Sequence, residues 1–280
     1  MKPLSDLTLM DRFLFACAME DLEILQSVLQ IILGQDVILK DHAETEKELR
    51  TAPWLRSIRL DVITADLDNT VYNTEVQKKN TGNLLKRSRF YQSLIDSSLL
   101  PTGEIDFNQM PSAQLITIAP FDLFGRGLYR YSFRMKCQEV DDLWMEDGAV
   151  RTFLNTRGKD ASGVSQELVE LLHYFERTSD EAAAQSHSGR IKEIHKRVSR
   201  IKASEEIGVR YMQEWEERIY EVKEAEARGE ERGQERGIEA FILDYLEDGT
   251  PKERIIAKLV KRFHIDCEAA EKYFEKYSRP

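Results

Sequence analysis

Two strand-like segments and the turn between them, residues 58–77 (IRLDVITADLDNTVYNTEVQ), decide how this chain is expected to fold. Residues 58–65 and 70–77 are rich in β-branched side chains, which strands favour. Residues 66–69 (DLDN) between them have the composition of a turn. The stretch therefore predicts a β-hairpin.

The geometry of that turn determines which side chains face each other. A three-residue loop, 67–69, with Asn69 at positive φ, places Asp61 opposite Glu75. Because side chains alternate between the two faces of a strand, Gln77 then shares the face of Glu75. Opposed carboxylates repel by a few tenths to about 1 kcal/mol.

A divalent cation would remove this repulsion. Hard oxygen ligands suit Mg²⁺ or Mn²⁺, which can hold a phosphate oxygen and an attacking water together. The hairpin therefore predicts a metal site at Asp61 and Glu75 that hydrolyses a phosphodiester. The alternative is that both carboxylates are ordinary solvent-facing residues of an edge hairpin, and a one-residue shift of the loop would separate them.

The segments around the hairpin predict a mixed α/β fold. Residues 7–33 have apolar positions at helical spacing, with Asp11 and Asp21 as caps and Gly34 as the end. A short strand is expected at 37–39. The acidic segment 41–53, which contains Pro53, is expected to be mobile. After the hairpin we expect an amphipathic helix at 83–98 and strands at 114–119, 129–137 and 149–154.

The rest of the chain is expected to be helical. Residues 189–237 hold 12 Lys or Arg and 12 Asp or Glu, and 228–237 (RGEERGQERG) is interpreted as a hinge-like spacer because of its glycines. Residues 238–278 predict two or three short amphipathic helices. The predicted domains are a nuclease-like core at 1–162, a helical extension and charged spacer at 163–237, and a C-terminal helical unit at 238–280.

The charge pattern allows nucleic acid as a partner only at a local site. The net charge of −10 argues against a protein that coats nucleic acid along its whole surface. Residues 76–95, however, contain no acid. The basic residues of this window are Lys78, Lys79, Lys86, Arg87 and Arg89. They could contact a DNA backbone, although a solvated helix face is the ordinary explanation of such residues.

The composition also limits other classes of function. Cys17, Cys137 and Cys267 are too far apart in sequence for a paired-cysteine metal site, and the histidines are scattered, so zinc is not expected. No apolar stretch is long enough for a membrane span, and the N-terminus lacks the pattern of a signal peptide. A cytoplasmic location is therefore expected.

Several motifs, taken in order, resemble those of the PD-(D/E)XK nuclease superfamily, in the branch described as recombination-promoting nucleases or putative transposases. They cover nearly the whole chain. They are 11–25 (DRFLFACAMEDLEIL), 32–34 (ILG), 58–62 (IRLDV), 71–77 (VYNTEVQ), 86–96 (KRSRFYQSLID), 121–133 (FDLFGRGLYRYSF), 149–158 (AVRTFLNTRG) and 228–237 (RGEERGQERG).

The resemblance implies a restriction-endonuclease-like mixed sheet flanked by helices, followed by a long helix and a small helical C-terminal unit. It implies that Asp61 and Glu75 bind the metal. Gln77 occupies the place of the usual lysine, and an amide can hydrogen-bond but cannot supply positive charge. Arg87 and Tyr91 match an arginine–tyrosine pair of the family.

An acid from the first helix often completes such a site. Asp11 and Glu20 are both candidates, and Glu20 is carried into the predicted catalytic set together with Asp61, Glu75 and Gln77. The predicted DNA-binding residues are Lys78, Lys79, Lys86, Arg87, Arg89 and Tyr91.

The implied activity is Mg²⁺-dependent or Mn²⁺-dependent DNA cleavage linked to recombination or mobile elements. A second hypothesis is a catalytically weak or inactive nuclease fold that acts as a DNA-binding or assembly module. Gln77, the acidic net charge and the long helical segment motivate it. The helical C-terminal half suggests a homo-oligomer, and a single solvated helix explains the same pattern equally well.

Overall fold

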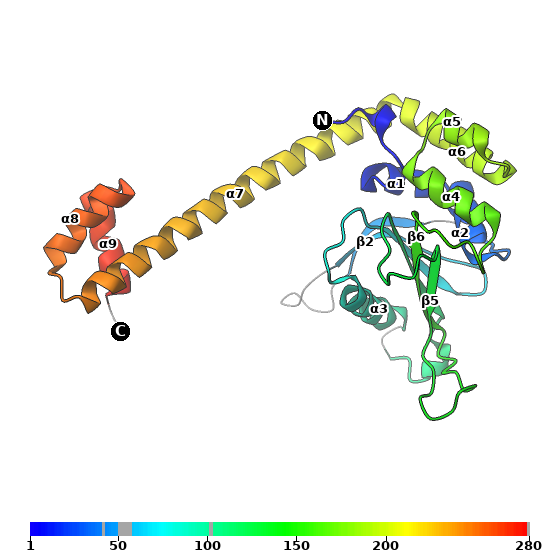
Figure 1. Cartoon of the computed structure of the whole chain (residues 1–280), viewed down its shortest axis with the longest axis horizontal. Helices are drawn as coiled ribbons and strands as arrows, with labels where there is room; N and C mark the ends of the chain where they lie inside the picture. Colours follow the sequence, from blue (N-terminus) through cyan, green and yellow to red (C-terminus); the bar gives the residue numbers. More distant parts are fainter. Residues whose placement is uncertain (41–42, 50–57, 101–102, 279–280) are drawn as a thin grey trace. The chain divides into compact units, whose positions relative to one another are not determined.

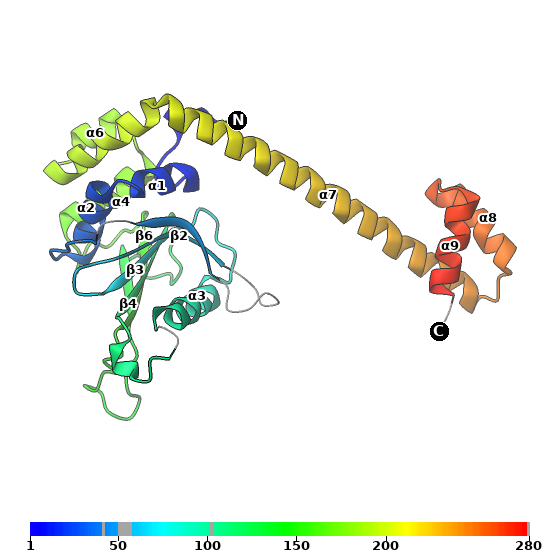
Figure 2. The ribbon, with the colours of Figure 1, turned by 180° about the vertical axis from the view of Figure 1, so that it is seen from behind.

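The computed structural model describes residues 1–40, 43–49, 58–100 and 103–278. The chain divides into two compact units, Met1–Tyr211 and Met212–Pro280. The first unit contains a six-stranded sheet with helices on both of its faces, as Figures 1 and 2 show. The predicted mixed α/β sheet flanked by helices is therefore confirmed.

The chain enters the sheet through two helices, α1 (Arg12–Met19) and α2 (Leu22–Leu33). The Asp21 carboxylate caps α2 by accepting hydrogen bonds from the amides of Glu23 and Ile24. Gly34 ends α2 with a φ of +70°, a conformation that glycine adopts without steric cost. Asp11 precedes α1, but its carboxylate makes no capping bond to that helix.

The sheet has mixed pairing. Its order is β1-β2-β3-β4-β6-β5. The β1–β2, β2–β3 and β5–β6 pairs are antiparallel, whereas β3–β4 and β4–β6 are parallel. The strands are β1 (Glu44–Leu49), β2 (Ile58–Ala65), β3 (Val71–Val76), β4 (Ala113–Ala119), β5 (Arg130–Phe133) and β6 (Ala149–Asn155).

The β2–β3 hairpin has the predicted register. Val62 pairs with Thr74 and Ala65 with Val71, which leaves Asp61 and Glu75 as the next positions along the two strands. Asn69 has a φ of +63°, as the three-residue loop requires.

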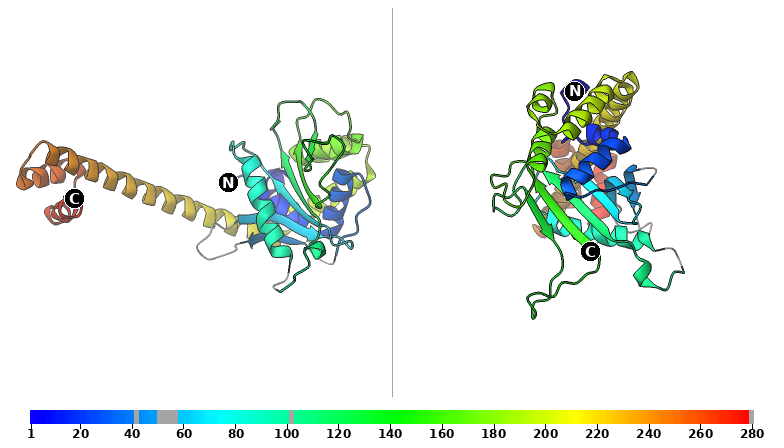
Figure 3. Two further views of the ribbon diagram at one scale, coloured as in Figure 1. Left: turned by 90° about the horizontal axis from the view of Figure 1, so that it is seen from below. Right: turned by 90° about the vertical axis from the view of Figure 1, so that its right-hand side faces the viewer.

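Two apolar cores lie on the two faces of the sheet. Helix α3 (Leu84–Leu99) packs against one face through Leu94 and Ile95, which join Leu60 and Leu115. The other face carries α1, α2 and α4 (Gln166–Glu176), which Figure 3 shows from two further directions. Helix α3 connects the parallel strands β3 and β4, which need such a crossover.

The helices between residues 163 and 203 belong to the core on the second face. Helix α4 contributes Leu171 and Phe175, and α6 (Gly189–Ala203) contributes Ile191 and Ile194. The short helix α5 (Asp180–Gln185) joins them. Residues 163–203, which the sequence assigned to an extension, therefore pack in the same compact unit as the sheet.

Two local predictions were wrong, and a third was confirmed. Residues 44–49, inside the segment expected to be mobile, form strand β1, while 41–42 and 50–53 lie outside the described residues. Residues 37–39 contribute only an isolated bridge between Leu39 and Asp66. The helical character predicted for 228–237 is confirmed, since these residues belong to α7 (Glu205–Glu247); Arg and Glu favour a helix strongly enough to tolerate the glycines.

The second unit has a small apolar core of its own. Helices α8 (Lys252–Phe263) and α9 (Cys267–Tyr277) pack with the last turns of α7. Ile238, Ile242 and Leu259 are fully buried there. None of the helices in the described part of the chain combines the length and apolar character that crossing a membrane requires.

Candidate active site

Asp61 of β2 and Glu75 of β3 are buried side by side, and each bonds to the backbone of the other strand. The Asp61 amide donates to Glu75 Oε1 over 3.0 Å, and the Val76 amide donates to Asp61 Oδ2 over 3.1 Å. Asn73 also donates to Glu75 Oε1, over 3.3 Å. At this position the two strands are therefore joined by hydrogen bonds from backbone amides to carboxylates, in place of the usual bonds between backbone amides and carbonyls.

A third carboxylate, Glu46 of β1, lies on the other side of Asp61. Thr45 pairs with Val62 and Lys47 with Leu60, so the position facing Asp61 is Glu46. Glu46 has a φ of +56°, a backbone conformation that costs a residue with a side chain on the order of 1 kcal/mol. Carboxylates from three neighbouring strands therefore occur in line, at a point where the strand pairing is interrupted.

Arg12, the first residue of α1, partly balances this negative charge. Its Nε lies 2.8 Å from Asp61 Oδ1 and 2.8 Å from Glu46 Oε1. Arg59 of β2 also forms an ion pair with Glu46. Within the described residues, Glu75 has no ion pair of this kind and is bonded only by the Asp61 amide and Asn73.

Burial and charge repulsion shift the acidity of both central carboxyls. Burial and the nearby Asp61 charge raise the pKa of Glu75 to about 8. Burial also raises the pKa of Asp61, while the Arg12 guanidinium opposes that shift. Without a cation, Glu75 is therefore a proton-holding group near neutral pH.

Glu75→Gln is expected to stabilise the metal-free chain more at pH 8 than at pH 4. The pKa of Glu75 rises from its ordinary 4.5 to about 8 on folding, so its stabilising contribution is present below 4.5 and is lost as the pH rises through 8. Glutamine keeps the acceptor oxygen without the charge. Because one pKa unit corresponds to about 1.4 kcal/mol, we expect a gain on the order of 4 kcal/mol at pH 8 and almost none at pH 4.

Thermal melts in EDTA at the two pH values measure this difference. Glu104→Gln, at an exposed loop position, is the matched control and should leave the melting temperature unchanged at both. Equal effects of the two substitutions at pH 8 would show that Glu75 carries no buried charge.

Gln77 lies beyond the end of β3 and contacts the helix that follows. Arg87 of α3 donates to Gln77 Oε1 over 2.5 Å, and the Gln77 amide donates to the Lys79 carbonyl over 2.6 Å. The Arg87 guanidinium lies 5.6 Å from the centre of the Tyr91 ring. The positive charge of Arg87 favours the ionised forms of both Glu75 and Asp61. The Arg87 guanidinium thus holds the Gln77 amide in place.

One face of α3 lines an open cleft of about 550 Å³, which we call the α3 cleft. Its lining residues are Arg12, Ile58, Arg59, Asn83, Lys86, Arg87, Phe90 and Tyr91. Four of these are cationic and, among the described residues, none is acidic. Asp61 and Glu75 are not among its lining residues, but Arg12 lines the cleft and also forms an ion pair with Asp61, so the cleft and the carboxylate pair share this residue.

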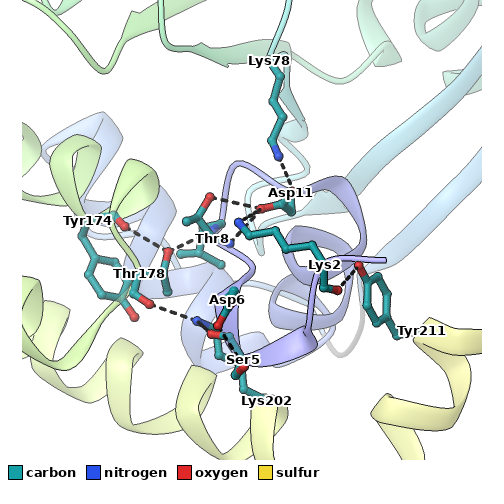
Figure 4. A network of polar contacts seen from close by, with 11 residues as sticks. Lys2, Ser5, Asp6, Thr8, Asp11, Lys78, Tyr174, Thr178, Lys202 and Tyr211 are labelled. Carbon is teal, nitrogen blue, oxygen red and sulfur yellow. Dashed lines mark hydrogen bonds and ion pairs between the residues drawn. The ribbon is translucent and has the colours of Figure 1, made fainter. Parts of the chain in front are cut away.

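The predicted DNA-binding residues do not all lie together. Lys86, Arg87 and Tyr91 line the α3 cleft, whereas Lys79 and Arg89 are exposed and are not part of its lining. Lys78 points elsewhere and forms an ion pair with Asp11 (Figure 4).

The two candidate acids of the first helix have other partners. Asp11 accepts a hydrogen bond from the Thr8 amide and pairs with Lys78 (Figure 4). Glu20, at the far end of α1 from Arg12, pairs with Arg210 at 2.9 Å and accepts from Thr45 Oγ1. Among the described residues, neither forms a hydrogen bond or ion pair with the side chain of Asp61 or Glu75, so the catalytic role of Glu20 stays a prediction.

Sequence reasoning missed Arg12 and Glu46. The strongly charged segment 44–49 (ETEKEL) does not show the apolar alternation from which strands are recognised. A positive φ at Glu46 leaves no signal in the sequence. Arg12 contacts Asp61 only because α1 packs over the hairpin, and the sequence does not show that packing.

Within the described residues, no group of three or more His, Cys, Asp or Glu side chains is arranged to hold a metal ion. The candidate site is therefore a pair of carboxylates with adjacent cations. Comparisons of the chain with protein-family models, with curated proteins and with solved structures found no match.

Proposed function

We propose that this chain is a metal-dependent nuclease that hydrolyses phosphodiester bonds in DNA, with Asp61 and Glu75 as the ligands of Mg²⁺ or Mn²⁺. The observation that carries the proposal is the buried pair of carboxylates, joined through Arg12 to a cleft lined by cations. The resemblance to the PD-(D/E)XK superfamily, in its recombination-promoting nuclease or putative transposase branch, supports the same assignment.

The donor set fits such a cation. Mg²⁺ prefers carboxylate oxygens, keeps several waters, and is commonly bound through one or two carboxylates together with substrate phosphate. Burial and, after it, the nearby Asp61 charge raise the pKa of Glu75, and a bound dication would favour its ionised form. When bound, the cation would polarise the phosphate and lower the pKa of an attacking water.

The surrounding residues have separate tasks in this proposal. Arg87 and Lys86 hold the phosphate backbone in the α3 cleft, where their charge offsets that of the substrate. Gln77, fixed by Arg87, orients a water or a phosphate oxygen by hydrogen bonding. Arg12 supplies positive charge beside Asp61, which compensates in part for the missing lysine.

We also assign the sheet to the restriction-endonuclease-like class. The support is the β2–β3 hairpin that carries both acids, followed by the α3 crossover into the parallel strand β4. The link to recombination or mobile elements rests on the resemblance alone.

The proposal is tested by incubating the purified full-length chain with supercoiled plasmid. Mg²⁺ or Mn²⁺ should yield nicked and linear products, and EDTA should prevent their formation. If Glu75→Gln cleaved the plasmid at the rate of the unaltered chain, Glu75 would not be a ligand of the catalytic cation.

Lys86→Ala is expected to weaken DNA binding about three- to tenfold, and Arg89→Ala is its matched control on the same helix. Lys86 lines the α3 cleft, whereas Arg89 is exposed outside it. Loss of one phosphate contact also lowers the slope of log affinity against log salt by about 1. Fluorescence anisotropy with a labelled oligonucleotide over a salt series measures both effects, and equal losses in the two variants would contradict the assignment of the cleft.

A second candidate function is a catalytically weak or inactive module that binds DNA. The observation that favours it is the contact of Arg12 with Asp61 and Glu46, because a guanidinium there balances carboxylates without any metal. Such a module would bind DNA through Lys86 and leave plasmid intact with either cation. The two functions are thus separated by the same pair of assays.

A further inference from the structure

The α3 cleft combines cations with an exposed aromatic ring. Phe90 is 39% exposed although it is a large apolar residue, and it lines the cleft beside Lys86 and Arg87. The cleft-lining residues of α3 and its N-cap recur every three or four positions, at Asn83, then at Lys86 and Arg87, then at Phe90 and Tyr91. They therefore lie on one face of the helix. Leu85, on the same helix, is 49% exposed but lies outside the cleft.

An exposed phenyl ring among phosphate-binding cations has a specific use. In duplex DNA the bases are stacked and paired, and the backbone is what a surface groove meets first. In single-stranded DNA the faces of the bases are free, and proteins bind them by combining a basic groove with aromatic rings on which bases stack. The α3 cleft has both a basic lining and an exposed aromatic ring.

The size of the cleft also favours a single strand. About 550 Å³ lies within the range of roughly 300–1,000 Å³ that is typical of sites for small molecules. Such a volume suits one or two nucleotides. It does not suit a double helix, which would have to lie across the opening.

We propose that the α3 cleft binds an unpaired segment of a DNA strand and that the ring of Phe90 stacks on one of its bases. Lys86 and Arg59 hold the flanking phosphates, and Arg12, which contacts Asp61, lies nearest to the carboxylate pair. This inference rests on the proposed function and deepens it, because it names single-stranded or locally unpaired DNA as the substrate class.

The test measures binding without cleavage. Labelled single-stranded DNA and a duplex of the same length are titrated with the full-length chain in EDTA, and affinity is read by fluorescence anisotropy. We expect tighter binding of the single strand. Phe90→Ala should weaken single-strand binding at least about fivefold and change duplex binding little.

Two variants guard against indirect effects. Phe90→Tyr keeps an aromatic face and should retain single-strand affinity, and Leu85→Ala removes an exposed apolar side chain outside the cleft and should leave it unchanged. Tighter binding of the duplex, or equal losses for Phe90→Ala and Leu85→Ala, would overturn the proposal. Because EDTA prevents cleavage, failure of this test differs from failure of the nuclease proposal, which is read from plasmid cleavage with Mg²⁺.

Discussion

Asp61→Ala is expected to lower the rate of Mg²⁺-dependent plasmid cleavage at least about a thousandfold. Asp61 is 4% exposed, directly beside Glu75, and would provide one of only two protein ligands of the cation. Removing it takes away both the ligand and the polarisation that depends on it, and losses of this size are ordinary for groups that act on the transition state. The measurement is the initial rate of nicking of supercoiled plasmid.

The control for this prediction is Asp68→Ala, an exposed aspartate in the turn of the same hairpin. It should cleave at the rate of the unaltered chain. Asp61→Asn, which keeps the size of the side chain, separates loss of the ligand from loss of folding: it should melt cooperatively and still fail to cleave. Unchanged cleavage in Asp61→Asn would exclude a metal ligand at this position.

Ending the chain at residue 162 is expected to abolish cooperative folding, whereas a chain that ends at Tyr211 should fold. Helices α4 and α6 supply Leu171, Phe175 and Ile194 to the core beneath the sheet, and all three are almost fully buried. Each such side chain contributes about 1.5–3 kcal/mol, so their joint loss is comparable to the whole stability of a domain, about 5–15 kcal/mol.

Near-UV circular dichroism during heating distinguishes these two chains. Residues 1–211 correspond to one compact unit and retain the contact of Tyr211 with Phe13, whose ring centres are 4.9 Å apart. A sharp melt of the 1–162 chain near that of residues 1–211 would show that the helices after 163 are dispensable for the fold.

The hairpin could be predicted from the sequence because its signals are local. β-Branched residues, a turn composition and the preference of Asn69 for positive φ fix two strands and their register within 20 residues of chain. The same register brought Asp61 and Glu75 together. Helix α3 was predicted for a similar reason, since its apolar positions repeat at helical spacing.

The partners of the carboxylates could not be predicted, because they come from distant segments. Arg12 reaches Asp61 only once α1 packs over the sheet, and Glu46 faces it only once β1 pairs with β2. The burial of α6 was missed as well, because its many charges hide a narrow apolar stripe formed by Ile191, Ile194 and Val198.

Self-association through the helical C-terminal half stays a prediction. Helix α7 has exposed apolar residues, among them Val209, Tyr220 and Val222, alongside its many charges. These side chains are compatible both with a partner helix and with a solvated one.

Calorimetric titration of the full-length chain with Mn²⁺ tests the central claim most directly. The claim is that Asp61 and Glu75 together bind one divalent cation. We predict saturable binding to the unaltered chain at pH 8, retained in Asp68→Ala and lost in both Asp61→Asn and Glu75→Gln. Binding of equal affinity in all four chains, or no binding to any of them, would contradict it.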